Sequence, residues 1–237
     1  MNSSHQPRLR AVTIPKTPAA ILWDMDGTLI DSEPYWIDAE TSLAARFGVP
    51  WTYDDGLTLV GNSLEVSAHI LMERGVRLSP EEIITTMVND VAARAADHMP
   101  WLQDARDLLS LVLEAKIPCA LVTMSIGPFV AAFLESAGPV FSAVVTGDDV
   151  AHGKPHPEAY LSAAALLGVD ARDCLAIEDS PSGTRAAVSS GATTIGVRRH
   201  ADLPQLEGMS RCASLTGLTV ESLTRIHGGQ IRIDEGV

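Results

Sequence analysis

Basic residues are scarce in this chain of 237 residues. The 17 lysines and arginines stand against 30 aspartates and glutamates, which gives a formal net charge of -13 at pH 7. Nucleic acids and anionic membranes bind basic protein surfaces, so this balance argues against both as partners. An anionic substrate would have to be attracted by a local positive site, because the overall field repels it.

Cysteine is also rare, and the chain holds only Cys119, Cys174 and Cys212. No two of them have the spacing of metal ligands, and two lie in apolar segments typical of buried strands. We therefore expect reduced thiols in the core and a cytoplasmic location.

Long uninterrupted apolar runs are absent. The longest apolar region, residues 108–134, is interrupted by Glu114, Lys116 and Pro118, which excludes a membrane-spanning helix. Residues 1–18 mix serine, proline and arginine without an apolar segment, so they are not a secretory signal and are expected to form a loose tail.

The 46% hydrophobic content suits an α/β protein, and the length allows one large domain or a core with a smaller cap. Apolar spacing predicts helices over residues 33–47, 64–74 and 81–96. Ser32 is a candidate N-cap of the first helix, and Gly48 would stop it. Ser79 precedes the Pro-Glu-Glu opening of the third, which is typical of a capped helix. Residues 32–100 are therefore predicted to be all-helical.

From residue 101 onward, apolar strands alternate with helices. In addition to the apolar run 19–23, strands are predicted near residues 118–123, 142–146, 174–178, 193–197 and 210–213. Such alternation is typical of parallel βαβ units. We expect an α/β fold in which residues 19–31 and 101–237 form a Rossmann-like parallel sheet flanked by helices. An all-helical cap, residues 32–100, would be inserted after the first strand.

Two carboxylates, Asp24 and Asp26, follow the first apolar strand directly, and Gly27 marks a turn. Ligand sites of parallel sheets lie at the carboxyl ends of the strands. Like charges so close together are costly unless a cation or a shared reaction offsets their repulsion. A plain polar turn after a strand is the alternative interpretation.

Three further segments carry reactive groups. The strand 119–122 is followed by hydroxyl side chains, the loop 153–157 (GKPHP) presents a lysine, and a third strand ends in the acids at 178 and 179. The chain has only three lysines, Lys16, Lys116 and Lys154, so one held between a glycine and a proline favours a function over an ordinary surface position.

In this order, the four segments closely resemble the four motifs of the haloacid dehalogenase superfamily of phosphotransferases. Residues 19–197 resemble its β-phosphoglucomutase-like branch, and the helical insert resembles the C1-type cap of that family. The resemblance implies that Asp24 is a nucleophile forming an aspartyl-phosphate, and that Asp26 is the acid/base. Asp26 also argues against dehalogenation, because dehalogenating members lack the proton-transfer role of the second aspartate.

The resemblance further implies a Mg²⁺ site and a phosphate site. The metal would be held by the side chains of Asp24 and Asp179 and by the backbone carbonyl of Asp26, with Glu178 as a further candidate. Lys154 would neutralise charge on Asp24 and on the transferred phosphoryl group. The predicted catalytic residues are thus Asp24, Asp26, Lys154 and Thr123, and the predicted phosphate-binding residues are Gly27, Thr28, Thr123, Met124, Ser125 and Lys154. The first two of these would act through backbone N–H groups.

Candidates for substrate contact in the cap are Glu33, Trp36, Gly61 and Asn62. Glu33 is equally well explained as a first-turn helix charge, and Trp36 as part of the cap core.

His152 and His156 flank Lys154 and suggest a metal site. The glycine and proline between them prevent a shared helical face, so we favour loop histidines. Phosphonate cleavage through a Schiff base is disfavoured, because residues 32–100 contain no lysine.

The expected function is a Mg²⁺-dependent phosphatase acting on a sugar phosphate or a nucleoside or ribosyl phosphate. The alternatives are a phosphosugar mutase and a non-catalytic sensor of phosphorylated metabolites. Mutases of the β-phosphoglucomutase type carry a histidine where this chain has Trp36 and an arginine where it has Leu64, which favours the phosphatase. Arg74 and Arg77 are other sources of the cation that a mutase needs. The partner is expected to be a small-molecule phosphate ester, and the protein a monomer or weak homodimer.

Overall fold

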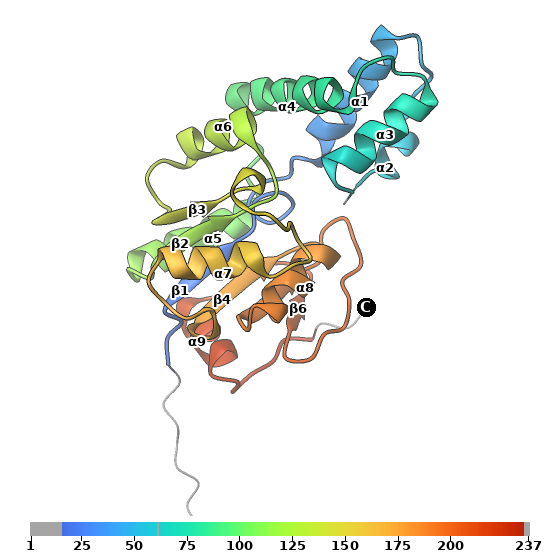
Figure 1. Cartoon of the computed structure of the whole chain (residues 1–237). Coiled ribbons are helices and arrows are strands. Elements are labelled where there is room, and N and C mark those ends of the chain that lie inside the picture. The colour runs from blue at the N-terminus through green and yellow to red at the C-terminus, as the bar shows by residue number, and fades with distance from the viewer. Residues whose placement is uncertain (1–15, 61, 235–237) are drawn as a thin grey trace, which may run out of the picture.

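The computed structural model describes residues 16–60 and 62–234. Within them a six-stranded sheet has the order β3-β2-β1-β4-β5-β6, and every neighbouring pair is parallel (Figure 1). The strands are β1 (Ala20–Trp23), β2 (Cys119–Val122), β3 (Ala143–Val145), β4 (Cys174–Glu178), β5 (Thr193–Val197) and β6 (Ser210–Cys212). The predicted strands are confirmed to within one or two residues.

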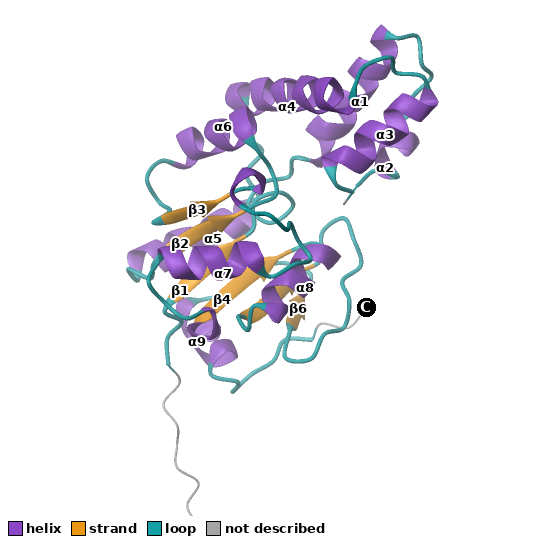
Figure 2. Cartoon of the chain, in the orientation of Figure 1, coloured by secondary structure: helices purple, strands orange, loops and turns teal. Residues whose placement is uncertain are grey.

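Helices cover both faces of this sheet. Helices α7 and α8 pack on one face, and α5 and α9 belong to the apolar cluster on the other (Figure 2). The helices are α1 (Glu33–Arg46), α2 (Tyr53–Leu57), α3 (Leu64–Arg74), α4 (Pro80–Asp97), α5 (Gln103–Glu114), α6 (Gly127–Ala137), α7 (Glu158–Leu166), α8 (Pro181–Ser189) and α9 (Val220–His227), with 3₁₀ turns η1 (Gly147–Asp149) and η2 (Ala171–Asp173). The predicted α/β class, with its helical cap, is confirmed.

Strand β1 lies at the centre of the sheet, and its four residues are fully buried. Ile21 and Trp23 enter one apolar cluster while Ala20 and Leu22 enter the other, because alternate side chains of a strand point to opposite faces. Burial on both faces explains the unbroken apolar run in the sequence. Trp23 pairs in register with β2 and β4, so the carboxyl ends of these three strands lie level.

Helices α1 to α4 pack on one another, and α4 also packs against α6 (Figure 1). The three helices predicted here are confirmed. Helix α2 was not predicted, because five residues are too few to show a helical period. The predicted division into cap and core at residues 32 and 100 stays a prediction.

The helix starts differ in how their serines act. Ser79 caps α4 as predicted, and it forms a capping box with Glu82 in which each side chain accepts from the other residue's backbone N–H. Ser32 occupies the N-cap position of α1 but makes no capping hydrogen bond; its hydroxyl donates to Asp26 instead, at 2.6 Å. The predicted cap at Ser32 is therefore corrected: a nearby carboxylate is the stronger acceptor for this hydroxyl.

Of the predicted N-terminal tail, residues 1–15 lie outside the described residues, and Lys16 forms an ion pair with Asp173 at 2.8 Å. The three cysteines are buried. Among the described helices, none has the length and apolar character needed to cross a membrane.

We predict that Ser79→Ala lowers the free energy of unfolding by about 1 kcal/mol, because it removes the side-chain half of the α4 cap. Ser42→Ala, the same change at an exposed interior position of α1, is the matched control and should be neutral or slightly stabilising. Urea unfolding of both variants measures this, and equal effects would contradict the role of the cap.

Candidate active site

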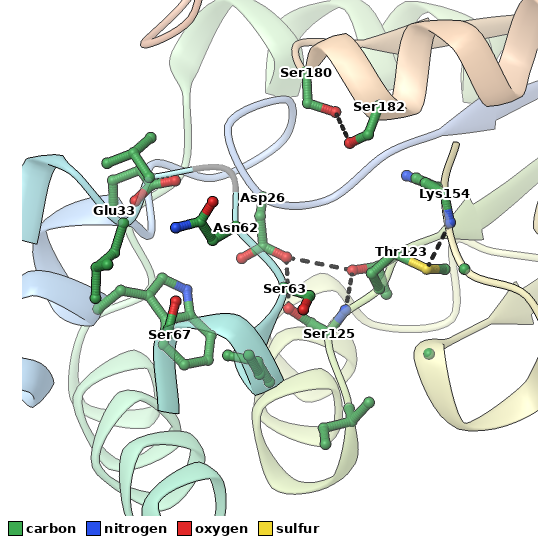
Figure 3. Close-up of a pocket in the computed structure, with 18 of the residues that line it drawn as sticks. Asp26, Glu33, Asn62, Ser63, Ser67, Thr123, Ser125, Lys154, Ser180 and Ser182 are labelled. Atoms are coloured by element: carbon green, nitrogen blue, oxygen red, sulfur yellow. Dashed lines mark hydrogen bonds between the residues drawn. The ribbon is translucent and has the colours of Figure 1, made fainter. Parts of the chain in front are cut away.

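A cavity of about 670 Å³ lies between the carboxyl ends of the strands and the helices α1 to α4. Figure 3 shows Asp26 near its centre, with Thr123 and Ser125 on one side and Glu33 and Asn62 on the other. All four predicted motifs reach it, since its lining includes Asp24, Thr123, Lys154 and Asp179. The four motifs therefore meet at one cavity, while the catalytic and binding roles of their residues stay predictions.

Lys154 is held by the ends of three strands. Its Nζ lies 2.6 Å from Asp24 Oδ1 and 2.6 Å from Glu178 Oε1, and it donates to the Val122 carbonyl at 2.9 Å. Its side chain is only 4% exposed, so this ion pair is screened little by water. The buried cation offsets the repulsion between the two carboxylates.

Asp24 has one engaged oxygen and one without a partner. Oδ1 takes the Lys154 hydrogen bond, and the buried Oδ2 has no hydrogen-bond partner among the described residues. Burial and the charge of Glu178 raise the pKa of Asp24, and Lys154 opposes the rise. An additional cation or an electrophile beside Oδ2 would remove the cost of leaving it unpaired.

Asp26 is surrounded by hydroxyl groups. Ser32 donates to Oδ1 at 2.6 Å, while Ser125 and Thr123 donate to Oδ2 at 2.7 and 3.3 Å (Figure 3). Burial raises the pKa of Asp26, and these donors oppose the rise. Thr123 and Ser125 were expected to donate to phosphoryl oxygens; in this structure their hydroxyls orient Asp26 instead. Their role toward phosphate stays a prediction.

Glu178 is fully buried, and both of its oxygens are occupied. Oε1 accepts from Lys154 and from the Tyr160 hydroxyl at 2.8 Å, and Oε2 accepts from the Asp179 and Ser180 backbone N–H groups and the Ser180 hydroxyl. A Cβ added at Gly183 would overlap this carboxylate, so the first turn of α8 needs a glycine there. Glu178 holds Lys154 in place and has little capacity left for another ligand.

The side chains of Asp24, Glu178 and Asp179 bring carboxylate oxygens within 4.8 Å of one another, which suits a hard cation. Burial and the charges of Asp24 and Glu178 raise the pKa of Asp179, and a cation would reverse that effect. A Cβ at Gly27 would overlap the Asp179 carboxylate, so the turn after β1 packs directly on this acid. The unpaired Asp24 Oδ2 and the Asp179 carboxylate are the best-placed ligands.

The structure corrects the proposed backbone donors at Gly27 and Thr28. The Gly27 N–H donates to the Ile30 carbonyl at 2.7 Å and the Thr28 N–H to the Met25 carbonyl at 3.3 Å, so both close the turn. Neither residue is among those that line the cavity. Met124 does line it, and its sulfur accepts a hydrogen bond from the Lys154 backbone.

In the cap, Glu33, Trp36 and Asn62 line the cavity, whereas the candidate Gly61 lies outside the described residues. Burial, followed by the charge of Asp26, raises the pKa of Glu33 to about 7, and His200 opposes the rise. Trp36 also packs edge-on against Phe129, with ring centroids 5.7 Å apart, so it serves the core as well as the cavity.

Sequence reasoning missed Tyr160 and Glu40, and took Ser32 for a cap. Tyr160 lies on α7, three residues after the loop 153–157, and the sequence carries no signal that its hydroxyl contacts Glu178. The exposed His152 and His156 lie with Glu158 in a cluster where their ligand atoms are within 4.8 Å, although they share no helical face. Our preference for plain loop histidines stays a prediction.

Comparison with known proteins agrees with this geometry. The family model described as "Haloacid dehalogenase-like hydrolase" matches residues 21–197. Hexitol phosphatase A of Escherichia coli K12 is 32% identical over 78% of this chain and 85% of that protein. Hexitol phosphatase B of the same strain is 30% identical over 90% of this chain and 99% of that protein.

Solved structures show the same fold. The crystal structure of CbbY from Rhodobacter sphaeroides in complex with phosphate superposes with a TM-score of 0.78 at 26% identity, covering 87% of this chain and 99% of that one. A β-phosphoglucomutase from Clostridium difficile superposes with a TM-score of 0.71 at 22% identity, covering 90% and 98% of the two chains.

We predict that Gly27→Ala destabilises the protein more than Gly168→Ala. Both glycines have positive φ, +79° and +71°, but only at Gly27 would the added Cβ overlap a side chain, that of Asp179. Gly168→Ala should cost about 1–2 kcal/mol for the left-handed backbone, and Gly27→Ala about 1–3 kcal/mol more for the overlap. Urea unfolding compares the two, and equal losses would argue against close packing of the turn on Asp179.

Proposed function

The chain belongs to the haloacid dehalogenase-like hydrolases and is a phosphatase, and we propose that it hydrolyses a small sugar or nucleoside phosphate through an aspartyl-phosphate on Asp24. One observation carries the proposal: two carboxyl groups share a cavity in different environments. Asp24 lies on the Lys154 cation with its second oxygen unpaired, and Asp26 is held by three hydroxyls. Environments that differ in this way separate a nucleophile from an acid/base.

In the first step Asp24 attacks phosphorus, and the bond between phosphorus and the ester oxygen breaks. Asp26 donates its proton to that oxygen, and the alcohol leaves. Burial shifts the pKa of Asp26 in the direction that a proton donor needs, and the three hydroxyl donors oppose that shift. In the second step Asp26 takes a proton from water, which attacks the phosphoryl group and releases phosphate and the Asp24 carboxylate. The sum is ester plus water to alcohol plus phosphate.

Lys154 has two tasks in this scheme. Its hydrogen bond to Asp24 Oδ1 holds the carboxylate in a fixed orientation beside the cavity. Its positive charge offsets the anion that accumulates when a carboxylate approaches a phosphate, the main electrostatic cost of this reaction.

We propose Mg²⁺ as the cofactor, held by Asp24, Asp179 and the Asp26 carbonyl. The unpaired Asp24 Oδ2 and the clustered, buried acids fit a cation with hard oxygen ligands. Bound there, Mg²⁺ would supply positive charge to the transferred phosphoryl group. Glu178 acts in this proposal as the residue that positions Lys154.

The alternative of a phosphosugar mutase finds little support in the cavity. Trp36 and Leu64 line it at the two positions where the resembling mutases carry a histidine and an arginine. Arg74, a substitute source of cation, pairs with Asp55 at 2.8 Å and is not among the lining residues, and neither is Arg77. A non-catalytic sensor is disfavoured because Asp24, Asp26, Lys154 and Asp179 are all present. The cytoplasmic location and the monomeric or weakly dimeric state stay predictions.

We predict that Asp24→Asn lowers kcat at least about 10³-fold while the protein stays folded, because the amide is a poor nucleophile. Phosphate release from a panel of sugar and nucleoside phosphates measures activity, and circular dichroism checks the fold. Asp173→Asn, which lies at the amino end of β4 and away from the cavity, is the matched control and should keep wild-type activity. Activity of Asp24→Asn above a tenth of wild type would remove Asp24 as the nucleophile.

We also predict that activity depends on Mg²⁺ and that Ca²⁺ inhibits, because the acid cluster would need a compact octahedral ion. Excess chelator should abolish phosphate release, and Mg²⁺ should restore it. Mg²⁺ should also raise the Tm of the wild type more than that of Asp179→Asn, because binding to the folded state stabilises it. Full activity in excess chelator would contradict the metal site.

A further inference from the structure

The described residues that line the cap side of the cavity are acidic or uncharged. Among its described lining residues from helices α1 to α4 and their loops, none is basic, whereas Glu33, Glu40 and Glu65 are acidic and Asn62, Ser63 and Ser67 are neutral and polar. The lysine and the histidine that line the cavity elsewhere are already paired: Lys154 with its two carboxylates, and His200 with Asp31 at 3.0 Å. A second anionic group on a substrate would find no counter-charge at the cap side.

Glu40 is the most unusual of these residues. It is only 4% exposed, it lines the cavity, and its Oε2 has no hydrogen-bond partner among the described residues. The backbone of α2 packs closely on it, since a Cβ at Gly56 would lie 3.1 Å from Oε2. Trp51 Nε1 lies close enough to lower the pKa of Glu40, but it too has no hydrogen-bond partner of standard geometry among the described residues. A buried polar group without a hydrogen bond is costly, so its retention points to a ligand that supplies one.

Glu40 also lies far from the reacting groups. It follows Glu33 by seven residues on α1, two turns or roughly 10 Å along the helix. The charge of Asp26 contributes to the raised pKa of Glu33, whereas for Glu40 the contributing acid is Glu33. Burial and that charge raise the pKa of Glu40 to about 8. Whether ionised or not, a carboxyl group can accept a hydrogen bond from a substrate.

We propose that Glu40 is a specificity-determining residue that accepts a hydrogen bond from a hydroxyl or amino group on the leaving group, at the end away from the phosphate. The acidic and uncharged residues on the cap side of the cavity disfavour leaving groups that carry a second anionic group. The substrate class is therefore a monophosphate of a polyhydroxylated or amino-substituted carbon chain. This inference rests on the proposed phosphatase function and extends it to the part of the substrate that is released.

Three six-carbon monophosphates that differ in the charge of the leaving group test whether the cap side of the cavity disfavours a second anion. Sorbitol 6-phosphate, glucosamine 6-phosphate and 6-phosphogluconate differ in carrying no further charge, an ammonium or a carboxylate. We expect kcat/KM of the wild type for the first two to exceed that for 6-phosphogluconate by about 10-fold or more. The order of the first two tells a hydroxyl from an ammonium as the preferred donor. Equal or better turnover of 6-phosphogluconate would overturn the proposal.

Substitution of Glu40 tests the residue itself. Glu40→Met removes the acceptor at similar size and should lower kcat/KM for the preferred ester about 10-fold or more, mainly through KM. Glu40→Gln keeps the shape of the side chain without its charge. It should therefore reduce the difference in kcat/KM between the preferred ester and 6-phosphogluconate. Glu73→Gln, which removes an exposed acid on α3 that does not line the cavity, is the matched control and should leave the ranking unchanged.

p-Nitrophenyl phosphate separates this proposal from the proposed function, because its leaving group has no hydrogen-bond donor. Both Glu40 variants should hydrolyse it within about 2-fold of wild type if they lose only a substrate contact. An equal loss on p-nitrophenyl phosphate and on the sugar esters, or an unchanged substrate ranking, would overturn the role of Glu40 alone. A wild-type enzyme that hydrolyses none of these esters would overturn the proposed function and this inference together.

Discussion

The buried cation of Lys154 is the interaction on which the rest of the site depends. Asp24, Glu178 and Lys154 come from β1, β4 and the loop after β3, and their side chains are between 0% and 9% exposed. Removing two carboxylates from water costs several kcal/mol each unless a cation and hydrogen bonds compensate. Lys154 supplies the cation, and the donors around Glu178 supply the hydrogen bonds. The same arrangement that stabilises the buried acids leaves Oδ2 of Asp24 unpaired, and this oxygen is the candidate ligand of the proposed cation.

The turn after β1 places one side chain in the core and the two acids beside it at the cavity. Met25 is fully buried, and its carbonyl accepts the N–H groups of Thr28, Leu29 and Ile30, so the turn is anchored in the core. Asp24 and Asp26, on either side of Met25, both reach the cavity. Because the turn closes on itself, its N–H groups are used internally and the hydroxyls of Ser32, Thr123 and Ser125 take over the orientation of Asp26.

The sequence predicted the elements that depend on local pattern. A strand buried on both faces is apolar throughout, and a level parallel register brings the residues after β1, β2 and β4 to one edge; both consequences can be worked out without coordinates. Contacts that depend on the orientation of a side chain in the folded protein could not be predicted. Tyr160 reaches Glu178 from α7, and Ser32 turns from its own helix toward Asp26; no spacing rule encodes either choice. Glu40 was missed because a buried acid on an amphipathic helix looks like any solvent-facing glutamate until its neighbours are known.

The cavity is electrostatically unequal at its two ends, and this inequality orients a substrate. At the strand end, Lys154 and a bound cation would present positive charge to a phosphate; at the cap end, the described lining has acids and no base. In the proposed function, a phosphate monoester would therefore bind in one direction only, with its phosphate toward Asp24 and its remaining groups toward α1. Orientation of this kind contributes to rate as well as to selectivity, since it holds the reacting atoms together before the bond changes begin. In the proposed function, the bond changes thus depend on the residues at the sheet edge, while the choice of leaving group depends on helices α1 to α4.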